Sequence, residues 1–173
     1  MNENVTQITR DQIATYLDTT ANTGTPTLSL VGIGITEYGI DFNPQMSTKK
    51  YICNKNATTK LNSYQMQGAV TQECIKGDAV YDFVNKLRRE LKIGSEVKTH
   101  VYDVDMYDVE GTGTSAKYQA TKYECIVVIN GYAKGEDPTI EYSIYYNGDP
   151  VLGTVSLDDE GIATFTEEQQ VIE

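Results

Sequence analysis

Strict alternation of apolar and polar residues marks much of this chain as β-strand. In the stretch EVKTHVYDVDMYD (96–108), Tyr102 and Val104 fall on one face, and Asp103 and Asp105 fall on the other. Successive side chains of a strand point to opposite faces, so this pattern predicts a strand with one buried face. The other stretches that read as strands are 27–44, 64–75, 117–131, 139–150 and 151–166. We therefore expect seven or eight strands, mostly antiparallel.

One segment changes to the period of an α-helix. Its apolar residues recur at intervals of three and four, which places them in a single stripe that we expect to pack in the core. The stripe consists of Val80, Phe83, Val84, Leu87 and Leu91. Asp78 precedes it as an N-cap that accepts from the free N–H groups of the first turn. We expect Gly94 to end the helix.

Turn signals shape the strands on either side of the helix. Gly32, Gly34 and Gly39 predict bends or bulges within one long strand over 27–44. Asn147-Gly148 predicts a tight hairpin, because both residues adopt the positive φ that two-residue hairpin turns need. A final hairpin is expected to turn at 158–161.

The domain organisation follows from length and from three polar stretches. A chain of 173 residues fits one domain, since domains run roughly 100–200 residues. We expect residues 1–173 to form a single α+β domain, dominated by antiparallel sheet that is closed or sandwich-like. It would carry a flexible N-terminal arm (about 1–25), a long loop (about 43–63) and a C-terminal tail (about 167–173). A loop of that length is uncommon unless it has a function.

Composition argues against several classes of function. The net charge of −11 argues against nucleic-acid binding, because such binding requires clustered Lys and Arg to displace counterions. The first residues have no apolar stretch typical of a signal peptide, and no run approaches the roughly 18 apolar residues of a transmembrane helix. The three cysteines are far apart and odd in number, so neither a disulfide framework nor a zinc site is expected.

The residues that most often carry catalysis are scarce. His100 is the only histidine, which leaves no second histidine for a zinc site and no sequence context for a catalytic triad. The glycines at 32 and 34 lack the third glycine of a nucleotide-binding loop. The acidic run at 103–111 has Asp108 where a calcium loop needs glycine. We expect no cofactor, no metal and no enzymatic activity.

Three stretches together resemble the major tail tube proteins of long-tailed phages, particularly phages that infect Gram-positive bacteria. They are GITEYGIDFNPQMSTKKYI (34–52), NATTKLNSYQMQGAVTQECIKGDAVYDFVNKLRRELKIGSE (56–96) and SIYYNGDPVLGTVS (143–156). They hold, in the order of that family, a strand ending in N-P-Q, an N-A-T-T element, a K-G-D-x-V entry into a helix, and N-G-D-P. The resemblance implies a β-sandwich or half-barrel with one helix packed on its side.

The resemblance also implies an assembly and its partners. Copies of the chain would form rings, hexameric in this family, that stack around a tape measure protein and meet tail terminator and tail tip proteins. DNA would only pass through the channel, and the protein would be made in the host cytoplasm and end in the virion tail. The acidic candidates for the channel wall are Glu37, Asp41, Glu73, Asp103, Asp105, Glu124 and Glu141. The basic candidates for ring stacking, in the 43–63 loop, are Lys49, Lys50, Lys55 and Lys60.

Two other readings remain open from the sequence. The chain could be the tube subunit of a contractile phage, a tailocin or a related injection machine, which share this fold and ring symmetry. It could also be a β-sandwich binding or adhesion module on a virion, with some of its 13 tyrosines forming a surface patch. A hydrolase with a carboxylate pair is a third and weaker reading, because the chain has no tryptophan to stack on a sugar.

Overall fold

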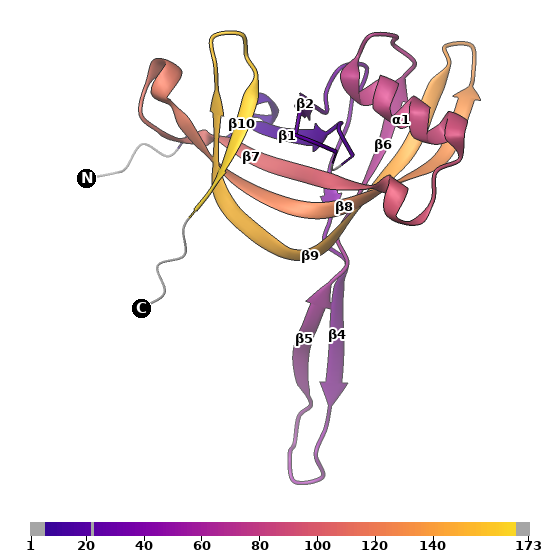
Figure 1. Ribbon diagram of the computed structural model, residues 1–173. Helices are drawn as coiled ribbons and strands as arrows, with labels where there is room; N and C mark the ends of the chain where they lie inside the picture. The colour runs from indigo at the N-terminus through magenta and orange to yellow at the C-terminus, as the bar shows by residue number, and fades with distance from the viewer. Residues whose placement is uncertain (1–5, 22, 169–173) are drawn as a thin grey trace.

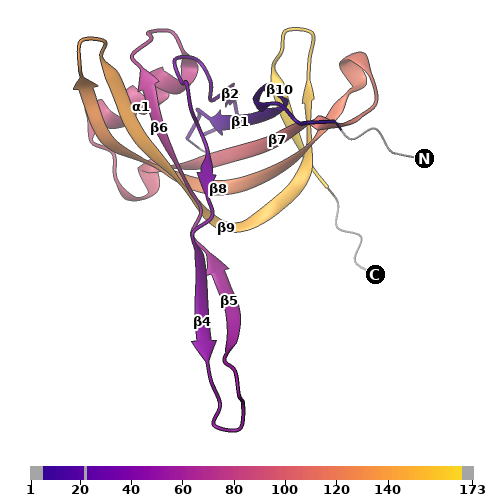
Figure 2. The same ribbon diagram turned by 180° about the vertical axis from the view of Figure 1, so that it is seen from behind.

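Antiparallel strands make up most of the computed structural model, which describes residues 6–21 and 23–168 (Figures 1 and 2). The first half of the chain contains β1 (Ile13–Asp18), β2 (Leu28–Leu30), β3 (Ile40–Asp41), β4 (Pro44–Lys49), β5 (Thr58–Tyr64) and β6 (Gln67–Glu73). The second half contains α1 (Ala79–Glu90), β7 (Lys98–Glu110), β8 (Lys117–Lys134), β9 (Thr139–Leu157) and β10 (Ala163–Glu167). Short 3-10 helices lie at Arg10–Gln12, Gly94–Val97 and Gly113–Ser115.

Six strands close into a barrel, and two further strands extend the sheet. The strand order is β10-β2-β1-β7-β8-β9-β6-β3, and β10 also pairs with β9, which closes the ring of six. β9 joins both parts: residues 139–145 pair with β6, whereas residues 153–157 pair with β10. The prediction of a mainly antiparallel fold with one packed helix is confirmed, with a closed barrel in place of a half-barrel.

The Asn147-Gly148 hairpin prediction is wrong. β9 runs straight through this dipeptide, and β8 pairs with it on both sides, Glu124 with Asn147 and Lys122 with Val151. The residues between form a bulge, in which Gly148 adopts a φ of 68°. A positive φ is normally found in a turn. In this strand it produces a bend instead, as bulges do where a sheet must curl into a barrel.

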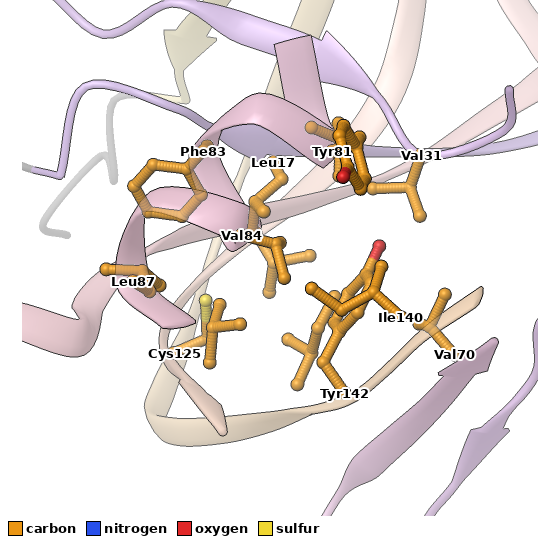
Figure 3. Close-up of a cluster of buried hydrophobic side chains, with 14 of the residues drawn as sticks. Leu17, Val31, Val70, Tyr81, Phe83, Val84, Leu87, Cys125, Ile140 and Tyr142 are labelled. Carbon is orange, nitrogen blue, oxygen red and sulfur yellow. The ribbon is translucent and has the colours of Figure 1, made fainter. Parts of the chain in front are cut away.

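Two cores lie on opposite faces of the same strands. Leu17 and Val101 belong to a cluster beneath α1, shown in Figure 3, whereas their chain neighbours Tyr16 and Tyr102 belong to a cluster inside the barrel. Adjacent residues of a strand point to opposite faces, so β1 and β7 are covered on both sides. At roughly 25 cal/mol per Å² of buried apolar surface, both clusters stabilise the central strands.

The helix begins as predicted and ends three residues earlier than expected. The Asp78 side chain accepts a hydrogen bond from the backbone N–H of Tyr81, which caps the first turn. The helix buries the predicted stripe against the sheet, at Val80, Phe83, Val84 and Leu87. Leu91 is not: it adopts a left-handed φ of 48° as the C-cap, turns away from the stripe and is 81% exposed. The termination expected of Gly94 is therefore made by a leucine.

The N-terminal third differs from its prediction. The expected flexible arm contains β1, where Thr15, Tyr16 and Leu17 are buried between β2 and β7. The single strand expected over 27–44 is interrupted, because residues 31–34 form turns and only Ile40–Asp41 returns to the sheet. The predicted tail beyond residue 168 and the first five residues lie outside the described residues.

Candidate assembly surfaces

The segment predicted as a long loop is a protruding β-hairpin. Within residues 6–21 and 23–168, β4 and β5 pair only with each other, from Pro44 with Tyr64 to Lys49 with Thr58, and form a separate two-stranded sheet. Figures 1 and 2 show the hairpin directed away from the body, across the direction in which β7 runs. Every residue from 43 to 65 is exposed except the partly buried Ser47.

The hairpin leaves the sheet as a continuation of the β3–β6 pair. Asp41 pairs with Gln67, and the ladder resumes at Pro44 after the backbone N–H of Gln65 has bonded to the Phe42 carbonyl at 3.1 Å. The Phe42 ring meets the Tyr64 ring edge-on, with centroids 5.9 Å apart. These contacts set the direction of the hairpin, while nothing in the described part of the chain covers its faces.

Apolar and basic side chains share the hairpin surface. Met46, Tyr51, Ile52 and Leu61 are all exposed, and Ile52 at the tip has an exposed fraction of 108%. The four stacking candidates Lys49, Lys50, Lys55 and Lys60 are exposed as well. Residues 43–65 contain no acidic side chain, so they contribute +4 to the net charge of −11 and leave −15 on the rest. A lone two-stranded hairpin is marginal in water, which makes these exposed groups suited to a partner.

A buried glutamine fixes the segment that leads to the hairpin. Gln72 of β6 is fully buried, and its amide donates to the carbonyl of Ile33 at 3.0 Å and to the Asp78 carboxylate at 2.8 Å. Its Oε1 accepts from the Tyr142 hydroxyl at 3.1 Å. One side chain thus joins the turn at residues 31–34, the helix cap and β9, which holds the start of the segment in place.

A second polar network fixes the end of the same segment. The Tyr38 hydroxyl lies 2.9 Å from that of Tyr146, which donates to Asp103 Oδ1 at 3.2 Å. Thr15 donates to the same oxygen at 3.0 Å. The Tyr38 ring crosses Gly68 so closely that a Cβ there would lie 2.6 Å from the ring, so a glycine is required beneath it. Alternating positions predicted neither network, because each joins residues distant in sequence.

Asp103 has to be removed from the candidates for the channel wall. The predicted alternation is correct, since Tyr102 and Val104 point into the barrel core, but the opposite face is covered by Tyr38 and Tyr146. Burial raises the pKa of Asp103 to about 6, although the hydrogen bonds from Thr15 and Tyr146 partly oppose this rise. Its carboxylate is therefore an internal acceptor.

Four of the seven acidic candidates share one uncovered sheet face. Asp41 pairs with Gln67 at the edge, and Glu73, Glu124 and Glu141 project from the side of β6, β8 and β9 opposite the helix. We call the side of β3, β6 and the adjoining parts of β8 (124–130) and β9 (139–145) that lies opposite α1 the open face. Two of its acids are paired, because Lys98 lies 3.0 Å from Glu124 and Lys134 lies 2.6 Å from Glu141. Glu37 and Asp105 lie elsewhere, in the 31–39 segment and on the Asp103 side of β7.

Sequence reasoning missed that the hairpin is β-structure and that it carries apolar groups. The Thr-rich sequence TTKLNSY was a usable signal, because β-branched and aromatic residues favour strands.

Within residues 6–21 and 23–168, no group of three or more His, Cys, Asp or Glu side chains could hold a metal ion. In that same part of the chain, no helix is long and apolar enough to cross a membrane.

Comparisons with known proteins place the fold. No family model and no curated protein matches the chain. Among solved structures, the chain is similar to one from the tail of an empty GTA particle, computed with helical refinement and C6 symmetry. The TM-score is 0.51 at 9% sequence identity, and the match covers 83% of this chain and 97% of that chain. The closed barrel with its extended sheet and single helix is therefore a fold that occurs in the tail of that particle.

Proposed function

We propose that this chain is a structural subunit of a phage tail tube and not an enzyme. The observation that carries the proposal is the fold shared with nearly the whole length of a chain from the GTA particle tail. The sequence resemblance to tail tube proteins of long-tailed phages, carried by three stretches between residues 34 and 156, supports the same proposal.

In the proposed assembly, six copies form a ring and rings stack into a tube around a tape measure protein. Sixfold symmetry is supported by the C6 symmetry of the similar tail. The hairpin supports stacking, because it projects from the body with exposed apolar side chains and four lysines that would meet the acidic surface of a neighbouring ring. Opposite charges at such contacts steer association and fix register.

The open face is the proposed wall of the channel. It is uncovered, and it carries Asp41, Glu73, Glu124 and Glu141 among mostly polar neighbours. A wall with few unpaired cations makes few contacts with phosphate, and DNA that releases few counterions on contact binds weakly and passes freely. The pairing of Glu124 and Glu141 with lysines makes this wall less acidic than the net charge of −11 alone would suggest.

Light scattering and negative-stain microscopy of the purified protein over a concentration series test this proposal. We expect hollow rings at moderate concentration and tubes at high concentration. Replacing residues 44–64 by Asn-Gly, which keeps the β3–β6 connection, should abolish tubes. It should leave the melting temperature of the body unchanged, because the hairpin contributes nothing to either core.

A variant with Lys49, Lys50, Lys55 and Lys60 changed to Gln is the matched control, because it keeps the hairpin and removes only its charge. Its stacking should be weaker at low salt and insensitive to added salt, since salt screens exposed charges over about 8–10 Å. A protein that stays monomeric at every concentration, also with a tape measure protein present, would contradict the tube proposal and favour a monomeric binding module.

A further inference from the structure

An apolar groove lies where the helix ends. It has a volume of about 470 Å³ and runs between the last turn of α1, the 91–97 connection and β8. Its apolar lining consists of Leu87, Leu91, Ile93, Val97, Val127, Val128 and Ile129. Leu91 and Ile93 are 81% and 76% exposed. Two large aliphatic side chains close together in sequence are thus open to solvent at this groove.

The backbone places these side chains in the open. Leu91 holds the left-handed conformation in which glycine is usual, and its N–H bonds to the carbonyls of Arg88 and Leu87. A leucine at this position is strained, and with 81% of it exposed it packs little against residues 6–21 and 23–168. Its side chain is therefore available to a partner.

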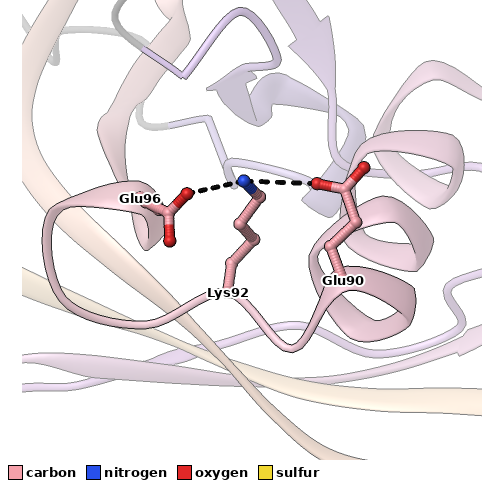
Figure 4. Close-up of polar contacts among 3 residues, drawn as sticks. All are labelled: Glu90, Lys92 and Glu96. Atoms are coloured by element: carbon pink, nitrogen blue, oxygen red, sulfur yellow. Dashed lines mark hydrogen bonds and ion pairs between the residues drawn. The ribbon is translucent and has the colours of Figure 1, made fainter.

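The last turns of α1 and the connection beside the groove are basic. Residues 86–98 hold five basic and two acidic side chains in a chain whose net charge is −11. Both acids are already engaged, because Lys92 lies 3.3 Å from Glu90 and 2.6 Å from Glu96, as Figure 4 shows. Lys86 and Arg89 are exposed on the adjoining face of α1, next to the groove lining and not in it, and neither forms a salt bridge within residues 6–21 and 23–168. An occupant of this groove should be apolar and acidic.

An exposed surface that is both apolar and acidic lies at the other end of the body, where β7 and β9 end. Tyr107 and Val109 are exposed at the end of β7, beside Asp108 and Glu110. The register joins this end to the turn after β9, because Glu110 pairs with Lys117 and Lys117 with Ser156. That turn adds three exposed acids at 158–160 and the exposed Ile162. We call residues 105–110 with 158–162 the acidic end.

We propose that the groove at the end of α1 receives the acidic end of a second copy of this chain, and that this contact is the lateral joint within a ring. The inference rests on the proposed tube function and adds the surface through which neighbours meet. The two surfaces differ, so the contact is head-to-tail, and a repeated head-to-tail contact forms a ring when its rotation closes.

The arrangement of the body agrees with a lateral joint. β7 runs from Lys98, next to the groove, to Glu110 in the acidic end, a span of roughly 40 Å for 13 residues. Figure 1 shows α1 and the β9–β10 turn on opposite sides of the body, with the hairpin pointing across the line between them. The joint and the hairpin thus face different directions, so one can form a ring while the other stacks it.

Charge reversal at the two ends tests the joint. The first variant carries Lys86→Glu with Arg89→Glu, and the second carries Asp108→Lys with Asp159→Lys; all four residues are exposed. Each variant alone should need a concentration about tenfold higher or more to form rings in sedimentation velocity, because like charges then face each other. A mixture of both variants should form rings again, since each reversed end then meets its complement.

Leu91→Gly and Leu91→Ala test the apolar part of the joint, and both should weaken ring formation without unfolding the body. Asp149→Lys, an exposed position in the β9 bulge away from both ends, is the control and should assemble as the original chain does. If the original chain forms rings and the reversed or Leu91 variants form them equally well, another occupant covers the groove and the inference is wrong while the tube function stands. If the original chain forms no rings at any concentration, also with a tape measure protein present, the tube function itself fails, and the joint with it.

Discussion

Two isoleucines show how the body and the hairpin differ. Ile144 of β9 is fully buried beneath the helix, whereas Ile52 at the hairpin tip is fully exposed. The strands around Ile144 pair with neighbours on both edges, β8 on one side and β6 on the other. In the part of the chain that the structure describes, the hairpin strands β4 and β5 pair only with each other.

The difference concerns where the free energy of burial is realised. In the body, burial of side chains such as Ile144 offsets the conformational entropy lost on folding, so the chain is stable by itself. In the hairpin, Met46, Tyr51, Ile52 and Leu61 remain in water and can be buried only against another molecule. The body therefore carries the fold, and the hairpin is built for association.

The largest expected effect is the difference in stability between alanine substitutions at the two isoleucines. Ile144→Ala should lower the free energy of unfolding by about 3 kcal/mol, because it leaves a cavity in a packed core. Ile52→Ala should change it by less than about 0.5 kcal/mol, as substitutions at exposed sites do, yet it should reduce tube formation. Urea denaturation at a concentration below ring formation measures the first quantity, and electron microscopy the second.

Leu61→Ala extends this test from the tip to a hairpin strand. A loss of stability at Leu61 comparable to that at Ile144 would mean that the hairpin folds against the body, and the division into fold and association regions would then be incorrect.

The elements that depend on local pattern could be predicted from the sequence. The helix stripe from Val80 to Leu87 and its Asp78 cap follow from spacing and capping alone. The alternation around Asp103 correctly separated Tyr102 and Val104 from the acids. These features arise within a few residues, so they need no knowledge of the rest of the fold.

The remaining features depend on partners far along the chain. Asn147-Gly148 forms a bulge and not a turn because β8 is long enough to pair on both sides of it. Asp103 looked like a solvent-facing acid because its cover, Tyr38 and Tyr146, lies 65 and 43 residues away. For the assembly surfaces, the sequence named the four lysines of residues 43–63 and the four acids of the open face. It did not indicate the exposed apolar side chains, since their exposure becomes visible only once the core is known.

The next effect in size concerns Asp103 and its hydrogen-bond network with Tyr146 and Tyr38, which fixes the segment that leads to the hairpin. A carboxylate whose folded pKa is raised to about 6 stabilises the fold below its unfolded pKa near 4, and this contribution is lost as the pH rises through about 6. Asp103→Asn keeps the size and the acceptor oxygen without the charge. The variant should exceed the original chain in stability by about 1–2 kcal/mol at pH 8 and match it near pH 4.

Denaturation midpoints at pH 4.5, 6 and 8 measure this difference, with Asp149→Asn as a control that removes an exposed acid. A flat profile for Asp103→Asn would mean that the Asp103 carboxylate is well solvated, and that the contact of Tyr146 with it does not hold the segment.

The smallest expected effect concerns Leu91, a body residue that resembles the hairpin in its exposure. Leu91→Gly should raise the free energy of unfolding by roughly 0.5–1 kcal/mol, because the left-handed φ of 48° is strained for leucine and the gain exceeds the entropy that glycine adds to the unfolded chain. Leu91→Ala removes the same exposed side chain but keeps the Cβ, so it should bring no gain. Thermal unfolding of both variants separates backbone strain from side-chain loss. Equal stability of the glycine and alanine variants would show that the helix end is unstrained. A gain confined to glycine would show that the chain keeps a strained leucine that its own fold does not need, and only a contact with another chain then accounts for that side chain.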